Sequence, residues 1–277
     1  MNRLSILIYH RVLPWPDALL PSLPDVRRFD RQMKLLKRYF EVLPVSLAIK
    51  LLHRQALPPR AACITFDDGY ADNATHALPV LRKHELSAAF FIATAYLNGG
   101  QMWNDDVIAH ARQARLTPHE LDALLLQLKY LPFEERDKAA RALAPASQAP
   151  LMLTTEQVQS LIAAGMEIGA HTHSHPILSS MPDALAMADI RRGKAVLETI
   201  TQTPLTMFAY PNGKPGTDYD QRHVLMLRQL GFDIGFSTVA GVAYEGSDLL
   251  QLPRFTPWEP DRLRFLLRLL AQRRVLA

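Results

Sequence analysis

Short apolar runs alternate with stretches of helical periodicity along most of the 277-residue chain. This alternation is typical of α/β proteins, in which helices join parallel strands. Strands are predicted at 4–9, 62–66, 88–93, 166–170, 206–210 and 232–238, with a weaker one at 249–254. Amphipathic helices are predicted over 28–40 and 155–164. We therefore predict an α/β fold with a largely parallel sheet.

The pattern changes between about 101 and 153, where Ala, Leu, Gln, Glu and Arg dominate and no strand is indicated. We interpret this stretch as a helical insertion in a single domain that spans 1–277. The tail 261–277 predicts a basic amphipathic helix, with Leu263, Leu266, Leu267 and Leu270 opposite Arg262, Arg268, Arg273 and Arg274. Such a helix either packs on the domain or lies on a membrane surface, and both alternatives stay open.

Composition excludes several classes of protein. Hydrophobic residues make up 48% of the chain and charged residues 21%, which rules out a disordered protein. The net charge of +4 and the absence of a long Lys/Arg run give no indication of nucleic-acid binding. No apolar run reaches membrane-spanning length, and the opening residues lack the core of a signal peptide. A cytoplasmic location is expected, with contact to the inner membrane surface as a further possibility.

The single cysteine, Cys63, cannot form an internal disulfide or a cysteine-based zinc site, and it is expected in the core. The ten histidines are then the main candidates for metal ligands. Three of them, His171, His173 and His175, alternate directly after a predicted strand. Two histidines and one carboxylate suit a zinc-like ion with open positions, and non-haem iron is the chemical alternative.

Two adjacent carboxylates, Asp67 and Asp68, follow the predicted strand at 62–66 and precede Gly69. Where a strand ends in a turn, both side chains can face one cleft, and two charges so close need a cation or a proton between them. The alternative is that one caps a helix while the other is solvated. A third segment, Tyr210-Pro211-Asn212-Gly213, is a turn whose backbone N–H groups could serve an oxyanion.

The order Thr-Phe-Asp-Asp-Gly, His-Thr-x-x-His and Tyr-Pro-x-Gly resembles the polysaccharide deacetylase superfamily, also called carbohydrate esterase family 4 or the NodB-homology domain. The resemblance runs from Leu4 to Pro257, interrupted by the helical stretch. It implies a distorted (β/α)7 barrel and a hydrolase that removes N-acetyl groups from an acetamido-sugar or polysaccharide. It also implies a divalent metal, most simply zinc, with cobalt and nickel as alternatives.

The resemblance implies a role for each matching residue. Asp67 matches the catalytic base, and Asp68, His171 and His175 match the metal ligands. Thr172 matches the residue that braces the histidine loop, Asn212 the oxyanion donor, and Leu252 the apolar wall beside the acetyl methyl. Tyr210 and Pro211 belong to the third motif and are expected near the substrate. Trp103 and Trp258 are candidates to stack on sugar rings, although both could equally belong to the core.

The sequence departs from the family pattern in three ways, one of which is that the Asp-Trp pairing of the fourth motif is absent around Ser237-Thr238. The third motif lacks the arginine that usually pairs with the catalytic aspartate, and Arg254 is the candidate replacement. No histidine follows His223, so the general acid is expected to be His10, His173 or Asp67 itself. Two other functions are compatible with the fold: an amidase that acts on a small non-sugar amide, and an eroded module that only binds glycans.

Overall fold

The computed structural model describes residues 3–143 and 150–272. Within them, the strands are β1 (Arg3–Tyr9), β2 (Glu41–Val42), β3 (Ala61–Phe66), β4 (Ala89–Ile92), β5 (Glu167–Ala170), β6 (Met207–Ala209), β7 (Ile234–Phe236) and β8 (Ala243–Tyr244). They form a single sheet in the order β7-β6-β5-β4-β3-β1-β8, and β2 also pairs with β3. All pairings are parallel except that of β1 with β8.

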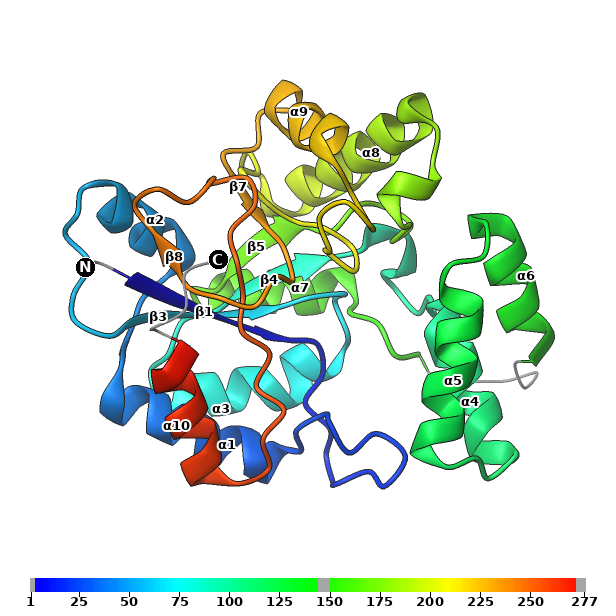
Figure 1. Cartoon of the computed structure of the whole chain (residues 1–277), viewed down its shortest axis with the longest axis horizontal. Coiled ribbons are helices and arrows are strands. Elements are labelled where there is room, and N and C mark those ends of the chain that lie inside the picture. The colour runs from blue at the N-terminus through cyan, green and yellow to red at the C-terminus, as the bar shows by residue number, and fades with distance from the viewer. Residues whose placement is uncertain (1–2, 144–149, 273–277) are drawn as a thin grey trace.

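Helices connect these strands and cover the outside of the sheet (Figure 1). They are α1 (Val26–Tyr39), α2 (Val45–His53), α3 (Leu78–Lys83), α4 (Trp103–Gln113), α5 (Pro118–Lys129), α6 (Phe133–Leu143), α7 (Thr155–Ala163), α8 (Asp183–Thr201), α9 (Gln221–Gln229) and α10 (Arg262–Gln272). The sheet curls into the distorted barrel that the sequence predicted. Each βα crossover brings the chain back to a parallel neighbour, so the carboxyl ends of the strands share one edge.

Residues 252–255 close the curled sheet between its first and seventh strands. Leu252 forms a parallel bridge with Phe236 of β7, and Phe255 forms one with Leu7 of β1. The Phe255 N–H donates to Ile6, and the Phe255 carbonyl accepts from Ile8. The strand expected at 249–254 is therefore present only as these single bridges. Pro253 has no N–H to donate, which prevents a regular ladder at this point.

Apolar residues on the two faces of β1, β3, β4 and β6 belong to two different clusters. On β3, Ile64 and Phe66 join the outer cluster with α1, α3, α7 and α8, whereas Cys63 joins the inner cluster with Phe91 and Leu252. This follows from the two-residue period of a strand. The inner cluster also includes apolar residues of α2. This helix lies at the amino ends of the strands, where the N–H groups of Val45 and Ser46 donate to Glu167 at the start of β5. Cys63 is a buried core residue, as expected.

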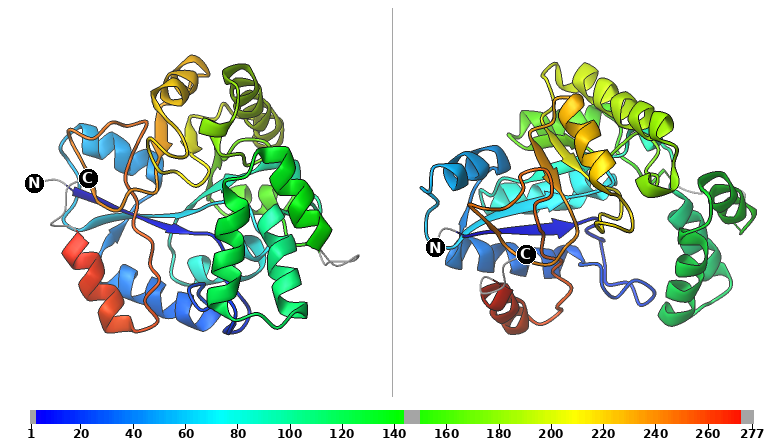
Figure 2. Two further views of the ribbon diagram at one scale, coloured as in Figure 1. Left: turned by 45° about the vertical axis from the view of Figure 1, so that its right-hand side comes forward. Right: turned by 45° about the horizontal axis from the view of Figure 1, so that its top comes forward.

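Helices α4, α5 and α6 occupy the stretch predicted as a helical insertion, and residues 144–149 of that stretch lie outside the described residues. The three helices pack on one another through a small apolar cluster of their own, which includes Val107, Leu121 and Leu128. Figures 1 and 2 show this group beside the carboxyl ends of the strands. The insertion therefore forms a wall facing the open edge of the barrel.

The C-terminal helix α10 packs on the domain. Phe265 and Leu269 are fully buried in the outer cluster, and α10 contacts α1. Leu263 and Leu267, which were predicted to share the packing face, are 59% and 56% exposed, because the helix is rotated toward Phe265. Arg273 and Arg274 lie outside the described residues. Among the described helices, none combines the length and apolar character needed to cross a membrane.

Candidate active site

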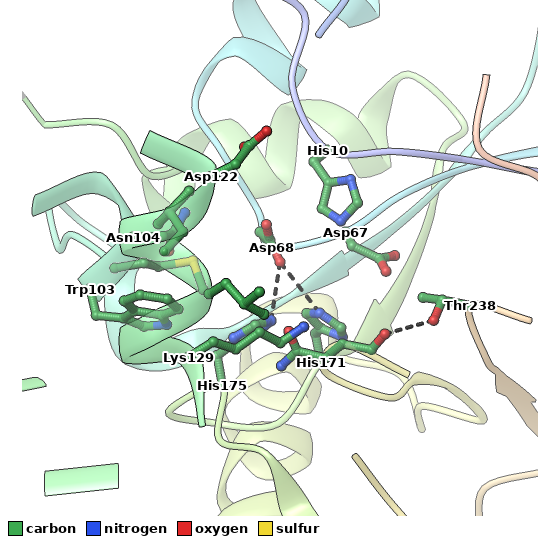
Figure 3. Close-up of a pocket in the computed structure, with 14 residues that line it drawn as sticks. His10, Asp67, Asp68, Trp103, Asn104, Asp122, Lys129, His171, His175 and Thr238 are labelled. Atoms are coloured by element: carbon green, nitrogen blue, oxygen red, sulfur yellow. Dashed lines mark hydrogen bonds and ion pairs between the residues drawn. The ribbon is translucent and has the colours of Figure 1, made fainter. Parts of the chain in front are cut away.

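A cavity of about 470 Å³ opens at the carboxyl ends of the strands (Figure 3). It brings together residues that are far apart in the sequence: His10 after β1, Asp67 and Asp68 after β3, His171 and His175 after β5, and Asn212 after β6. The opposite wall is formed by the insertion, including Trp103 and Asn104 of α4. The three predicted motifs therefore meet at one place, as expected where parallel strands end along a common edge.

The two adjacent aspartates point to different partners because the chain turns sharply after β3. The Asp67 N–H donates to the Tyr9 carbonyl at 2.9 Å, which continues the pairing with β1. Asp68 and Gly69 then adopt φ values of +74° and +88°, in the left-handed region. Gly69 also packs so closely on Ile92 that a Cβ there would lie 2.9 Å from its Cγ2 atom.

Asp67 forms a buried bidentate ion pair with Arg254. The two Asp67 carboxylate oxygens accept from Arg254 Nη1 and Nη2 at 2.7 and 2.6 Å, and the two residues are 2% and 1% exposed. Arg254 also donates through Nε to the Ser237 carbonyl at 2.9 Å. Burial by itself would raise the pKa of Asp67, but the charge and hydrogen bonds of Arg254, together with the nearby His171 and His10, lower it overall. Arg254 is the main group that favours the ionised form of Asp67.

Asp68 faces two imidazoles. Its Oδ1 atom lies 3.4 Å from His171 Nε2 and 3.3 Å from His175 Nε2 (Figure 3). One ligand atom from each of the three residues lies within 4.8 Å of the others, a spacing that one metal ion can bridge. His171 Nδ1 is 2.7 Å from the Ala209 carbonyl, so a proton on Nδ1 leaves Nε2 free as a ligand. This donor set fits a divalent cation.

The backbone of the histidine loop is held from two directions. Thr172 hydroxyl donates to the His171 carbonyl and accepts from the His175 N–H at 3.0 Å, which supports its predicted bracing role. Asp189 of α8 accepts from the N–H groups of His173 and Ser174 at 2.8 and 3.1 Å. Sequence reasoning missed Asp189, because no local pattern in α8 marks it as a partner of this loop.

Of the other candidate catalytic residues, His10 and Asn212 line the cavity and His173 does not. His10 lines the cavity beside Asp67 and Asp68 (Figure 3). His173 instead lies outside the lining, with its Nδ1 atom 2.8 Å from the Thr94 hydroxyl. Asn212 lines the cavity with a φ of +60°, and its carbonyl accepts from the Thr238 hydroxyl at 2.7 Å. Within the described residues, the Asn212 N–H makes no hydrogen bond.

Several predicted substrate-binding residues do not line the cavity. Tyr210 is fully buried and stacks on Tyr219 with the ring centroids 3.7 Å apart. Leu252 is buried in the inner cluster, and Pro211 is also buried. Trp258 is 53% exposed and stacks on Arg268, close to α10. Trp103 does line the cavity, and its ring also faces Arg136 at 5.1 Å.

One face of α5 forms a wall of the cavity that sequence reasoning missed. Asp122, Leu125, Leu126 and Lys129 all line it. Their spacing of three, four and seven residues places them on one helix face. That spacing was visible in the sequence, but the face resembled an ordinary packing surface. Leu126 is 64% exposed, so the face is open to a ligand.

Comparison with known proteins agrees with this geometry. The sequence model of the family described as polysaccharide deacetylase matches residues 54–235, more than half of the chain. The protein YxkH of Bacillus subtilis (strain 168) is 21% identical over 254 residues, which cover 91% of this chain and 70% of YxkH.

The fold is similar to that of solved deacetylases. The Streptococcus pyogenes deacetylase PplD, solved with acetate, aligns with a TM-score of 0.68 and 20% identity over 95% of this chain and 97% of PplD. IcaB from Ammonifex degensii aligns with a TM-score of 0.66 and 24% identity over 92% of each chain. Together with the family match, these findings identify the chain as a member of the polysaccharide deacetylase family, hydrolases that cleave the carbon–nitrogen bond of N-acetyl groups on carbohydrates.

Proposed function

We propose that the protein deacetylates an acetamido-sugar within a carbohydrate, with Asp67 as general base and Asp68, His171 and His175 as ligands of a divalent metal such as zinc. The observation that carries this proposal is the different environment of two adjacent carboxylates. Asp67 is paired with Arg254, whereas Asp68 faces two imidazoles. One carboxylate is thus available for proton transfer and the other for ligation.

The chemical problem is an unreactive amide carbonyl. A divalent cation held by Asp68, His171 and His175 would polarise that carbonyl and lower the pKa of water. Asp67 takes a proton from the attacking water, which requires an ionised carboxylate at the cavity wall. Arg254 supports this role because it lowers the pKa of Asp67 in spite of its burial.

Two further groups complete the reaction. Asn212 offers its backbone N–H to the developing oxyanion, and the loss of one such donor typically costs about 3–4 kcal/mol of barrier. The leaving nitrogen needs a proton, and we assign that transfer to His10, which lines the cavity beside both aspartates. His173 is the weaker candidate, because its Nδ1 atom is directed to the Thr94 hydroxyl.

The substrate wall lies opposite these residues. Trp103 offers an aromatic face to a sugar ring, and α5 offers Leu125, Leu126 and the cation of Lys129. Tyr210, Pro211 and Leu252 act behind the cavity surface, where they support the turn and the inner cluster. The cytoplasmic location and the contact of α10 with a membrane surface stay predictions from the sequence.

The adjacent aspartates provide a matched test. Purified Asp67→Asn is expected to retain one bound metal ion per chain but to release acetate from N-acetylated chito-oligosaccharides at least about a hundred-fold more slowly. Asp68→Asn is expected to lose the metal and the activity together. Wild-type turnover by Asp67→Asn would refute the base assignment. A panel of small amides, run in parallel, separates a sugar deacetylase from an amidase.

A further inference from the structure

A second cavity, of about 800 Å³, lies next to the catalytic one. It lies between the loop that follows β1 and one face of α4, which the views in Figures 1 and 2 place side by side. The loop contributes Leu13, Pro14, Trp15, Pro16, Asp17 and Ala18, and α4 contributes Asp105, Ile108, Ala109, Arg112 and Gln113. None of these residues takes part in the chemistry proposed above.

The loop that forms this cavity is fixed at both ends. Leu13 exchanges hydrogen bonds with the start of α1, since its N–H donates to Pro24 and its carbonyl accepts from Val26, both at 2.9 Å. At the other side, Asp17 pairs with Arg112 of α4. Leu19 and Leu20 pack on the apolar cluster of the insertion. The cavity wall is therefore preorganised, which reduces the entropy cost of binding a ligand.

Trp15 stands at the open side of this fixed loop. It is 70% exposed and lies between Pro14 and Pro16, which restrict its backbone. An indole that is so exposed does not gain the free energy of burying its apolar surface in the folded chain. Tryptophan is typical of surfaces that bind a partner with both apolar and polar groups. A pyranose ring is such a partner, with an apolar C–H face and a rim of hydroxyls. Gln113, which is exposed at the same cavity, can hydrogen-bond to those hydroxyls.

The two cavities are lined by neighbouring residues of the same two segments. His10 and Asn104 line the catalytic cavity, whereas their neighbours Arg11 and Asp105 line the second one. Tyr70 joins the two segments: its hydroxyl donates to Asp105 and accepts from Asn104, both at 3.1 Å, and Arg11 stacks over its ring. The two cavities thus lie on either side of this Tyr70 cluster, and a ligand of several linked rings is the kind of molecule that could occupy both.

We propose that the second cavity is a distal subsite for the same polysaccharide, in which Trp15 stacks on a sugar ring remote from the N-acetyl group being removed. This inference rests on the proposed function, because it assumes that the catalytic cavity takes an acetamido-sugar. It makes Trp15 a residue that determines preference for chain length.

The test compares Trp15→Ala with Trp258→Ala, a second exposed tryptophan that lines neither cavity. The KM for acetate release is measured on N-acetylated chito-oligosaccharides of two to six units. For the wild type, KM is expected to fall as the oligosaccharide becomes longer. In Trp15→Ala, the ratio of KM for the two-unit substrate to KM for the six-unit substrate is expected to be about five-fold smaller than in the wild type. Trp258→Ala is expected to follow the wild type. An unchanged length dependence in Trp15→Ala, or an equal loss in Trp258→Ala, would overturn the proposal.

A binding measurement separates this proposal from the proposed function. Asp67→Asn is titrated with the six-unit oligosaccharide, with and without Trp15→Ala, and the dissociation constant is measured by calorimetry. Binding that weakens about five-fold when Trp15 is removed supports the subsite even if no variant releases acetate. Equal binding with and without Trp15, or no binding by either protein, refutes the subsite. Acetate release by the wild type would stand in all these cases as a separate result.

Discussion

The carbonyl oxygen of Thr172 occupies the space in which a side chain at Gly193 would begin. A Cβ atom built at Gly193 would lie 2.4 Å from that oxygen, well inside van der Waals contact. Gly193 lies within α8, where glycine costs about 1 kcal/mol relative to alanine. The glycine allows α8 to approach the histidine loop, so that Asp189 of the same helix can accept hydrogen bonds from it.

Gly193→Ala is therefore expected to weaken metal binding although it changes no ligand. The added methyl group must displace Thr172 and with it the backbone between His171 and His175. Metal affinity is expected to fall by about ten- to a hundred-fold, the range typical of a disturbed ligand support. A zinc titration and thermal unfolding of the metal-free protein measure the two effects. If the clash were absent, alanine would stabilise the helix, so a higher melting temperature would contradict the prediction.

Arg254→Lys tests the pairing of the base. Lysine keeps the positive charge but cannot bind both carboxylate oxygens, so kcat is expected to fall more than KM rises. Because Arg254 lowers the pKa of Asp67, weakening the pair raises that pKa. The acidic limb of the kcat/KM profile should then move to higher pH. An acidic limb at the wild-type position would show that Arg254 does not tune Asp67.

Arg254→Met tests the same pair through stability. Removing one partner leaves a buried carboxylate uncompensated, which typically costs about 3–5 kcal/mol of unfolding free energy. The double variant Asp67→Asn/Arg254→Met removes both charges and is expected to recover much of that loss. Since the folded pKa of Asp67 is lowered, the wild-type contribution is present above the unfolded pKa and disappears as pH falls through the folded one. Urea unfolding of the variants at two pH values measures both effects.

The two histidine candidates for the general acid give opposite expectations. His10→Gln is expected to lower kcat by about a hundred-fold or more. His173→Gln serves as the matched control, because His173 bonds to Thr94 and does not line the cavity. A small effect, within a few-fold, is expected there. A larger loss in His173→Gln than in His10→Gln would reverse the assignment.

The buried carboxyl of Asp105 is expected to make the free energy of unfolding depend on pH. It is 3% exposed, and burial raises its pKa to about 7 in spite of Arg11. Between about pH 4 and 7 the folded state thus holds a proton that the unfolded chain has released, so stability falls as pH rises. One pKa unit corresponds to about 1.4 kcal/mol.

Asp105→Asn is expected to reduce this decline, as measured by urea unfolding at pH 5 and pH 7.5. Asp233→Asn is the control, because Asp233 is exposed to solvent. The prediction fails if the free energy of unfolding of Asp105→Asn declines between the two pH values as steeply as that of the wild type and of Asp233→Asn.

Local sequence patterns were sufficient for the longer strands and for the three motifs, but not for the two-residue strands β2 and β8. Apolar runs marked β1 and β3–β7, and the resemblance to the polysaccharide deacetylases matched Asp68, His171 and His175 to one metal site, where the structure brings them together. This worked because a parallel sheet places all its carboxyl ends on one edge. Arg254, which follows Leu252-Pro253, was also named from the sequence as the candidate replacement for the missing motif arginine.

Features that depend on long-range packing could not be predicted. The closure of the barrel by residues 252–255 uses isolated bridges to two distant strands, which leave no periodic signal. The α5 wall has the pattern of an ordinary amphipathic helix, and only the fold determines which face meets the cavity. Tyr210 lies next to the motif turn in sequence, yet its ring points into the core to stack on Tyr219.

The barrel-closing segment also carries Arg254, and this has a consequence for the order in which the centre forms during synthesis. A ribosome releases Asp68, His171 and His175 well before residue 254. A nascent chain can therefore gather all three ligands while its base still lacks a guanidinium partner. Binding of a metal ion by these three residues would then precede the pairing of Asp67 with Arg254, which forms only once residues 252–255 bridge β7 and β1.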